Sequence, residues 1–367
     1  MSQLFEPVSF TRGKAMPNRF MLAPLTNSQS HEDGTLSDAE YQWLSMRAEG
    51  GFGCTMTCAA HVQAIGKGFP GQLGIFSDDH LPRLRQLANK INSCNSVSIV
   101  QLHHAGNRSP KDVIGTDPVC PSDDPKSGAR ALSTAEVEQL TEDFIAAAQR
   151  AEAAGFDGVE LHGAHGYILC QFLSPETNQR TDQYGGPLAN RARIVFAILE
   201  GIRARCSPTF TVGIRLSPER FGMQLMEVRT LAQQLIDSGT IDFLDMSLWD
   251  CFKAPNEPEH QGRSLLSYFT DLERKGVKIG CAGKLHDPAD AERVLAEGAD
   301  FVVLGRVAIL HHNYPQLLRA NQAFVPKRPP VTADWLRQEG LGEAFIRYMS
   351  GWPGFVEDAQ SQSAAAN

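Results

Sequence analysis

The sequence lacks the features that mark nucleic-acid-binding, membrane and secreted proteins. Its 34 Lys and Arg against 42 Asp and Glu give a formal net charge of −8, which argues against nucleic acid as a partner because phosphate binding needs a basic face. No apolar run reaches the ~20 residues that span a bilayer, and the first residues do not follow the charged and then apolar pattern of a secretory leader. We therefore expect a cytoplasmic protein with no membrane segment and no nucleic-acid partner.

The eight cysteines do not follow the spacing of a metal site. Cys54 and Cys58 are the closest pair, but no second pair completes a zinc-like motif. Most of the cysteines stand in apolar stretches, which predicts buried free thiols of the kind found in a reducing cytoplasm. No metal site is expected.

What the sequence does contain is a regular alternation of short apolar runs and longer amphipathic stretches. The apolar runs predict strands at 21–26, 54–60, 97–103, 158–163, 211–217, 243–248, 278–282 and 301–305. Helical patterns follow the strands, and the clearest lie at about 38–49, 78–92, 134–154, 189–204, 226–238, 286–297 and 310–322. Eight strand–helix units in 367 residues favour an α/β fold with a single closed (β/α)8 TIM barrel over an open doubly wound sheet.

The same pattern indicates one domain with loop insertions. Residues 1–356 are expected to form the barrel, with 5–20 as a hairpin under its floor. Residues 357–367, which end in QSQSAAAN, are expected to be a disordered tail.

The densest group of polar side chains follows the strand predicted at 158–163 and reads Glu160-Leu-His162-Gly-Ala-His165-Gly-Tyr167. Alternation along the strand points Glu160 and His162 into the barrel, and the glycines permit a turn that brings His165 to the same side. Two imidazole N–H donors aimed at one point suit a developing oxyanion, and a nearby phenol is a reasonable proton donor. A zinc-binding pair and ordinary loop residues are the competing interpretations.

Two more strands contribute polar side chains near the same end. Arg215 is expected to point into the barrel, where a buried guanidinium needs a partner. Either Glu160 or a bound cofactor with negative character would supply it, and a purely structural Glu–Arg pair is the alternative. Gln101 can donate and accept hydrogen bonds at once, which suits an amide-like ring edge, although a capped strand end explains it equally well.

The last two strands end in Ala282-Gly283-Lys284 and Leu304-Gly305-Arg306. Glycines let backbone N–H groups approach an anion, and many barrels hold a phosphate after these strands. Together with the residues above, this predicts a phosphorylated flat heterocycle at the barrel mouth. FMN is the natural candidate, because no dinucleotide fingerprint is present.

Five stretches of the chain resemble the Old Yellow Enzyme family of FMN-dependent ene-reductases, over about residues 3–325. They are NRFMLAPLT (18–26), VQLHHAGNR (100–108), DGVELHGAHGYILCQFLSPETNQRTDQYGGPLANRAR (157–193), VGIRLSP (212–218) and VVLGR (302–306). The resemblance implies FMN as the cofactor and NAD(P)H as the hydride donor. It also implies reduction of the C=C bond of α,β-unsaturated carbonyl compounds or related activated alkenes.

The resemblance further implies a role for each matching residue. His162 and His165 would bind the substrate carbonyl oxygen, and Tyr167 would be the proton donor. Gln101 would read the pyrimidine edge of the flavin, and Arg215 would stabilise the reduced ring near N1 and the C2 carbonyl. The residues expected to line the flavin are Ala23, Pro24, Thr26 and Ala59, and those expected to hold its phosphate are Gly283, Gly305 and Arg306.

Some alternatives stay open at this point. A different FMN-barrel NAD(P)H oxidoreductase of the same family, such as a dienoyl-CoA, quinone or nitro-compound reductase, would share most of these residues. The polar stretch 249–263 is expected to form a lid over the pocket. The aromatic residues of 342–355 either pack within the chain or contact a partner subunit, so a homodimer is one of the alternatives.

Overall fold

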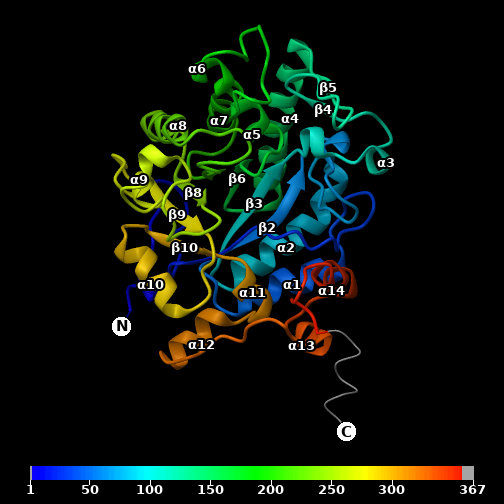
Figure 1. Ribbon diagram of the computed structural model, residues 1–367. Coiled ribbons are helices and arrows are strands. Elements are labelled where there is room, and N and C mark those ends of the chain that lie inside the picture. Colours follow the sequence, from blue (N-terminus) through cyan, green and yellow to red (C-terminus); the bar gives the residue numbers. More distant parts are fainter. Residues whose placement is uncertain (1, 358–367) are drawn as a thin grey trace.

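The computed structural model describes residues 2–357. Within them, eight parallel strands close a barrel in the order β1-β10-β9-β8-β7-β6-β3-β2, and helices surround it (Figure 1). The strands are β1 Phe20–Leu22, β2 Cys54–His61, β3 Val97–His103, β6 Gly158–Gly163, β7 Thr211–Leu216, β8 Phe243–Ser247, β9 Lys278–Ala282 and β10 Phe301–Leu304. The predicted TIM barrel is confirmed.

The helices alternate with these strands along the chain. The larger ones are α1 Asp38–Glu49, α2 Leu81–Ser93, α4 Thr134–Ala154, α7 Arg193–Arg205, α8 Leu225–Asp237, α10 Pro288–Ala296, α12 Tyr314–Ala320 and α14 Glu343–Ser350. Shorter elements lie in the loops: α3 Lys111–Ile114, β4 Val119–Cys120, β5 Arg130–Ala131, α5 Ile168–Leu173, α6 Leu188–Arg191, α9 Ser267–Thr270, α11 Arg306–Leu310 and α13 Ala333–Gln338. None of the helices within 2–357 is long and apolar enough to cross a membrane.

Local sequence accounts for the best-defined helix. Ser133 and Glu136 form the predicted capping box at the start of α4, and Gly155 ends the helix with a left-handed φ of 91°, a conformation that costs glycine little. The first strand departs from prediction. β1 ends at Leu22 rather than at 26, because Pro24 has no N–H with which to continue the ladder.

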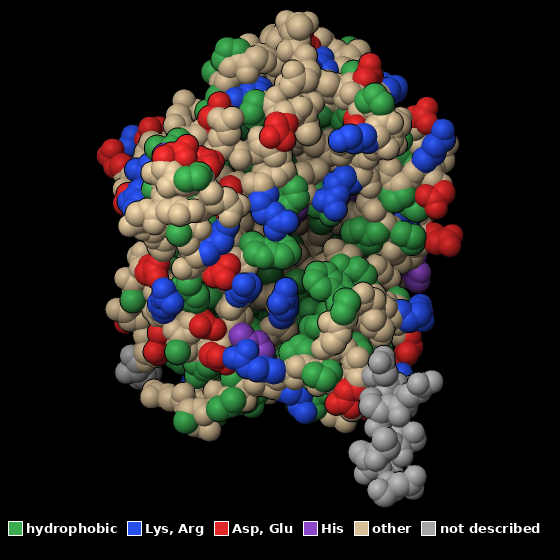
Figure 2. Space-filling view, in the orientation of Figure 1, with side chains coloured by type: hydrophobic (Ala, Val, Ile, Leu, Met, Phe, Trp, Pro, Cys, Tyr) green, Lys and Arg blue, Asp and Glu red, His purple; other side chains and the backbone are tan. Residues whose placement is uncertain are grey.

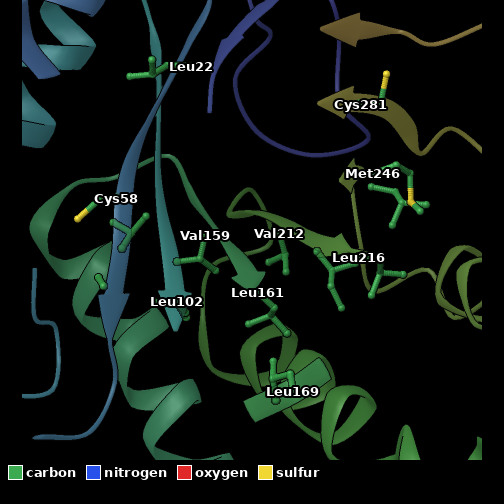
Figure 3. Close-up of a cluster of buried hydrophobic side chains, with 14 of the residues drawn as sticks. Leu22, Cys58, Leu102, Val159, Leu161, Leu169, Val212, Leu216, Met246 and Cys281 are labelled. Atoms are coloured by element: carbon green, nitrogen blue, oxygen red, sulfur yellow. The ribbon is translucent and has the colours of Figure 1, made fainter. Parts of the chain in front are cut away.

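Two apolar layers hold the barrel together. The outer layer lies between strands and helices, and Figure 3 shows part of it, including Leu102, Leu161 and Leu216. The inner layer fills the amino-terminal end of the barrel and includes Phe10, Phe243 and Phe301. Phe10 comes from the N-terminal hairpin, which Val8 and Met16 close with antiparallel backbone hydrogen bonds of 2.9 Å. The expected floor of the barrel is therefore present.

The tail expected from residue 357 lies, apart from Glu357 itself, outside the described residues. The preceding segment packs on the barrel. Phe345 of α14 is fully buried and its ring lies 5.4 Å from the ring of Trp43 in α1.

Candidate active site at the carboxyl end of the barrel

A cavity of about 850 Å³ opens at the carboxyl end of the strands. Figure 2 shows a hollow on this face, bordered by basic and hydrophobic side chains. Every residue predicted for the site lines the cavity: Ala23, Pro24, Thr26, Ala59, Gln101, His162, His165, Tyr167, Arg215, Gly283, Gly305 and Arg306. Residues far apart in the sequence therefore meet in one space, of a size that suits a cofactor with a small substrate.

The turn after β6 places three rings at the cavity mouth. His165 adopts a left-handed backbone with φ of 60°, and Gly166 follows with φ of 72°. The backbone N–H of His165 donates to Ser217 Oγ at 3.1 Å, which holds the turn against β7. As a result the ring of His162 lies 5.0 Å from that of His165 and 5.0 Å from that of Tyr167, measured between centroids.

The two imidazoles are hydrogen-bonded to each other in this structure. The backbone N–H of Ala164 donates to His162 Nδ1 at 3.4 Å, so the neutral ring carries its proton on Nε2. That Nε2 lies 3.2 Å from His165 Nδ1, and His165 Nε2 lies 2.6 Å from Ser247 Oγ. In this structure the N–H groups form a chain that runs from His162 through His165 to Ser247, and the expectation of two donors aimed at one substrate oxygen stays a prediction.

Burial determines the charge of these rings. Burial lowers the pKa of both His162 and His165 well below the ordinary value, and the positive charges of Arg215 and Arg108 lower it further. The imidazoles are therefore neutral at physiological pH. Each ring keeps one N–H as a hydrogen-bond donor but does not act as a cationic acid. Arg108 also positions the third ring: its guanidinium carbon lies 4.5 Å from the Tyr167 ring centroid, and its Nη1 donates to His165 O at 2.6 Å.

A layer of buried polar side chains lies below the rings, inside the barrel. Gln101 Nε2 donates to Glu160 Oε1 at 2.7 Å. Arg215 Nε lies 3.0 Å from Asp245 Oδ2, an ion pair that lacks hydrogen-bond geometry. Of the two partners considered for Arg215, Glu160 forms no ion pair with it in this structure. The partner is Asp245, which lies opposite Arg215 in the β7–β8 register and which the sequence reasoning missed.

Two carboxyl groups of this layer feel the charge of the Arg215 guanidinium, although only Asp245 is in contact with it. Burial raises the pKa of Glu160 well above its ordinary value, and the charge of Asp245 raises it further. Burial also raises the pKa of Asp245, although Arg215 opposes that effect. Burial thus shifts both carboxyl groups toward their neutral forms, and the charge of Arg215 opposes the shift at each of them. The guanidinium makes no hydrogen bond with any residue in 2–357.

The opposite side of the cavity is rich in cationic and backbone donors. Arg306 begins α11 directly after Gly305 and forms no ion pair with a described residue. A Cβ at Gly283 would lie 2.9 Å from the backbone nitrogen of Asp250, so this close approach of two loops requires glycine. Lys284 Nζ is 2.9 Å from Asp250 Oδ2. Lys284 is thus neutralised by a carboxylate, whereas Arg306 stays a cation that suits an anion.

Several cavity residues were not predicted. They include Phe69, His103, Ser247, His286, Arg328, Tyr348, Met349, Trp352 and Phe355. Of the stretch 249–263, only Trp249 lines the cavity, so the expected lid is reduced to its first residue. Of the aromatic residues of 342–355, Phe345 and Phe355 are buried within the chain and Trp352 is 44% exposed, so a contact with a partner subunit stays one of the two alternatives. The helical spacing of Phe345, Ile346 and Met349, all buried, was the signal that could have identified α14.

This arrangement defines the class of the protein. A parallel barrel whose carboxyl-end cavity combines an anion site, a buried guanidinium and neutral imidazoles is typical of an enzyme with a phosphate-bearing cofactor. The residues fit FMN: Arg215 has an unbonded guanidinium for the electron-rich edge of the ring, and Arg306 with its neighbouring glycines suits the phosphate.

Comparison with known proteins identifies the family. The model of the NADH:flavin oxidoreductase / NADH oxidase family matches residues 3–323. The "Probable NADH-dependent flavin oxidoreductase YqiG" of Bacillus subtilis is 37% identical over 322 residues, which are 85% of this chain and 86% of that protein. The NADH oxidase of Thermoanaerobacter brockii is 31% identical over 327 residues, 84% of this chain but 50% of that longer protein.

A solved structure agrees with the sequence relatives. The Old Yellow Enzyme homologue of Zymomonas mobilis superposes with a TM-score of 0.78 at 27% identity, covering 91% of this chain and 96% of that one. The chain belongs to the NADH:flavin oxidoreductase family, that of the Old Yellow Enzymes. It is an FMN-dependent oxidoreductase with NAD(P)H as the hydride donor.

Proposed function

We propose that this oxidoreductase reduces the C=C bond of α,β-unsaturated carbonyl compounds and related activated alkenes. The observation that carries the proposal is the convergence of His162, His165 and Tyr167 in the cavity that also holds Gln101, Arg215 and Arg306. Two neutral imidazoles suit a carbonyl oxygen that gains negative charge, and a phenol beside them suits protonation of the adjacent carbon.

The cofactor would be held along one side of this cavity. Arg306, Gly283 and Gly305 would bind the phosphate of FMN, while Gln101 and Arg215 would contact the pyrimidine part of the ring. Ala23, Pro24, Thr26 and Ala59 would line the ring. When bound, FMN would supply the hydride chemistry that links NAD(P)H to the β-carbon of the alkene.

The remaining steps fall to the side chains of this chain. His162 Nε2–H would turn from His165 to the substrate oxygen, and His165 Nε2–H would leave Ser247 to join it. The substrate oxygen would thus replace His165 Nδ1 and Ser247 Oγ, the acceptors that the two N–H groups have in this structure. Arg108 and the turn at Gly166 would keep the Tyr167 hydroxyl over the α-carbon, where it would release its proton.

The test is the variant Tyr167→Phe, with the two half-reactions followed separately under anaerobic conditions. Loss of a general acid typically costs about 10²- to 10⁴-fold in rate. We expect this loss in re-oxidation of the reduced flavin by 2-cyclohexen-1-one, with reduction of the flavin by NADPH unchanged. Tyr41→Phe, which changes a tyrosine of α1 outside the cavity, is the control. Equal rates for Tyr167→Phe and the control in both half-reactions would remove Tyr167 from the mechanism.

A panel of oxidants separates the proposal from related activities. An ene-reductase should transfer electrons to 2-cyclohexen-1-one faster than to oxygen. Fast turnover with a quinone or a nitroaromatic compound, and none with any activated alkene, would favour another NAD(P)H oxidoreductase activity of the same cavity.

A further inference from the structure

A third imidazole lies in the cavity and has no role in the mechanism above. His103 is the last residue of β3, the neighbour of β6 in the barrel. Its ring centroid lies 5.3 Å from that of His162 and 4.4 Å from that of Tyr167, both edge to face. The side chain is 1% exposed and lines the cavity, so it stands among the three rings already described.

The neighbouring Gln72 fixes which nitrogen of His103 carries the proton. Gln72 Oε1 accepts from the backbone N–H of Gly68 at 2.6 Å, and Gln72 Nε2 donates to Ala59 O at 2.8 Å. Exchanging the amide oxygen and nitrogen would set oxygen against oxygen and N–H against N–H, so the amide has one orientation. The second hydrogen of Nε2 points to His103 Nδ1 at 3.0 Å. That nitrogen is an acceptor, which leaves the proton on Nε2.

The Nε2–H of His103 differs from its neighbours because it is unused. His162 Nε2 and His165 Nε2 each have an acceptor, whereas His103 Nε2 forms no hydrogen bond with any residue in 2–357. Burial lowers the pKa of His103 well below its ordinary value, and His162 lowers it further. The ring therefore stays neutral and keeps a donor directed away from Gln72.

We propose that His103 is a substrate-binding residue whose Nε2–H donates to a second acceptor group of the alkene. A carbonyl oxygen has two lone pairs, which His162 and His165 satisfy under the proposed function on which this inference rests. A third donor then requires another acceptor on the same molecule. The cavity is thus suited to alkenes that carry two acceptors, such as enediones, over simple enones.

The test compares two oxidants that share one ring, 2-cyclohexen-1-one and 2-cyclohexene-1,4-dione, with the FMN-loaded enzyme. His103→Phe keeps an aromatic ring and removes the donor. A neutral hydrogen bond contributes about 3- to 10-fold in binding. We expect KM for the dione to rise by about that factor, with KM for the enone within about 2-fold. Equal changes for both oxidants would overturn the inference, because a purely structural role would affect both.

A second variant and a direct measurement guard against loss of folding. Gln72→Leu removes the donor to His103 Nδ1, so the ring proton can occupy either nitrogen. KM for the dione should then rise, by less than in His103→Phe. In ¹⁵N NMR of histidine-labelled enzyme, the signals lost in His103→Phe should show an unprotonated Nδ1 and a protonated Nε2. A protonated Nδ1 would contradict the inference. Enzyme that reduces neither oxidant would instead refute the proposed function itself.

Discussion

The two ends of the barrel interior are filled by opposite chemistry. The amino-terminal end is a plug of apolar side chains, with the ring of Phe243 6.1 Å from that of Phe301 and the ring of Phe10 5.5 Å from that of Phe243. The carboxyl end holds Glu160, Arg215 and Asp245, all buried. The same strands β7 and β8 contribute to both ends, so the change occurs within two or three residues along a strand.

This difference shows how the fold separates stability from chemistry. The lower end gains free energy from burial of apolar area, and the buried hydroxyl of Thr211 there is satisfied by Arg12 O at 3.2 Å. The upper end buries ionisable groups, which costs free energy unless they are paired or neutralised. This cost falls on the layer that contacts the cavity, where neutral imidazoles and a buried guanidinium are available to contact a bound molecule.

The largest effect on stability is expected when a side chain is added within the apolar amino-terminal end of the barrel. A Cβ at Gly213 of β7 would lie 2.1 Å from Phe243 Cζ, and the Phe243 ring is fully buried between Phe10 and Phe301. Gly213→Val should lower the free energy of unfolding by on the order of 3 kcal/mol, measured by urea unfolding. Gly262→Val, at a glycine with nothing within 4 Å of its Cβ, is the control. If adding Phe243→Leu restores no stability to Gly213→Val, the contact is not the cause.

A smaller effect, which depends on pH, is expected at the upper end. Burial lowers the pKa of His104 to about 3, while a histidine in an unfolded chain titrates near 6.5. The unfolded state therefore binds one proton more between these values, and this residue makes stability fall as pH falls. His104→Gln should reduce the slope of unfolding free energy between pH 6 and pH 4 by about 1.4 kcal/mol per pH unit.

The control for this pH effect is an exposed histidine. His31→Gln changes a side chain on the surface and should leave the slope of unfolding free energy against pH unchanged. A His104→Gln slope equal to that of the unmodified chain would show that His104 is charged in the folded protein.

The smallest effect is expected from Glu160, and it has the opposite sign. Because burial raises its pKa, the folded state keeps a proton that the unfolded chain loses above about pH 4.3. This residue therefore makes stability fall as pH rises. As pH rises from 5 to 6, the free energy of unfolding of Glu160→Gln should increase relative to that of the unmodified chain by roughly 1 kcal/mol. The control is Glu292→Gln, which changes an exposed side chain and should show no such increase. If both variants have the same pH dependence of unfolding free energy, the pKa of Glu160 is not raised in the folded protein.

Much of the cavity could be predicted because strand ends in a parallel barrel all meet at one rim. His162, Arg215 and Gly305 each follow or end a recognisable apolar run, so their meeting follows from topology alone. Asp245 was missed because a single aspartate in the apolar run Phe243–Ser247 has no local signal of its partner. His103 and Gln72 are 31 residues apart in sequence, and only the packing of the loop after β2 onto β3 shows that one orients the other.

The alternation of apolar runs, the caps of α4 and the glycines around His165 are local properties, and from these the sequence determined the barrel and the rim that carries its chemistry. The tertiary structure alone decided which charges pair, in which direction burial shifts the pKa of each carboxyl and which imidazole nitrogen holds the proton. These depend on burial and on contacts between distant segments, because a pKa and a tautomer are set by surrounding atoms rather than by neighbours along the chain.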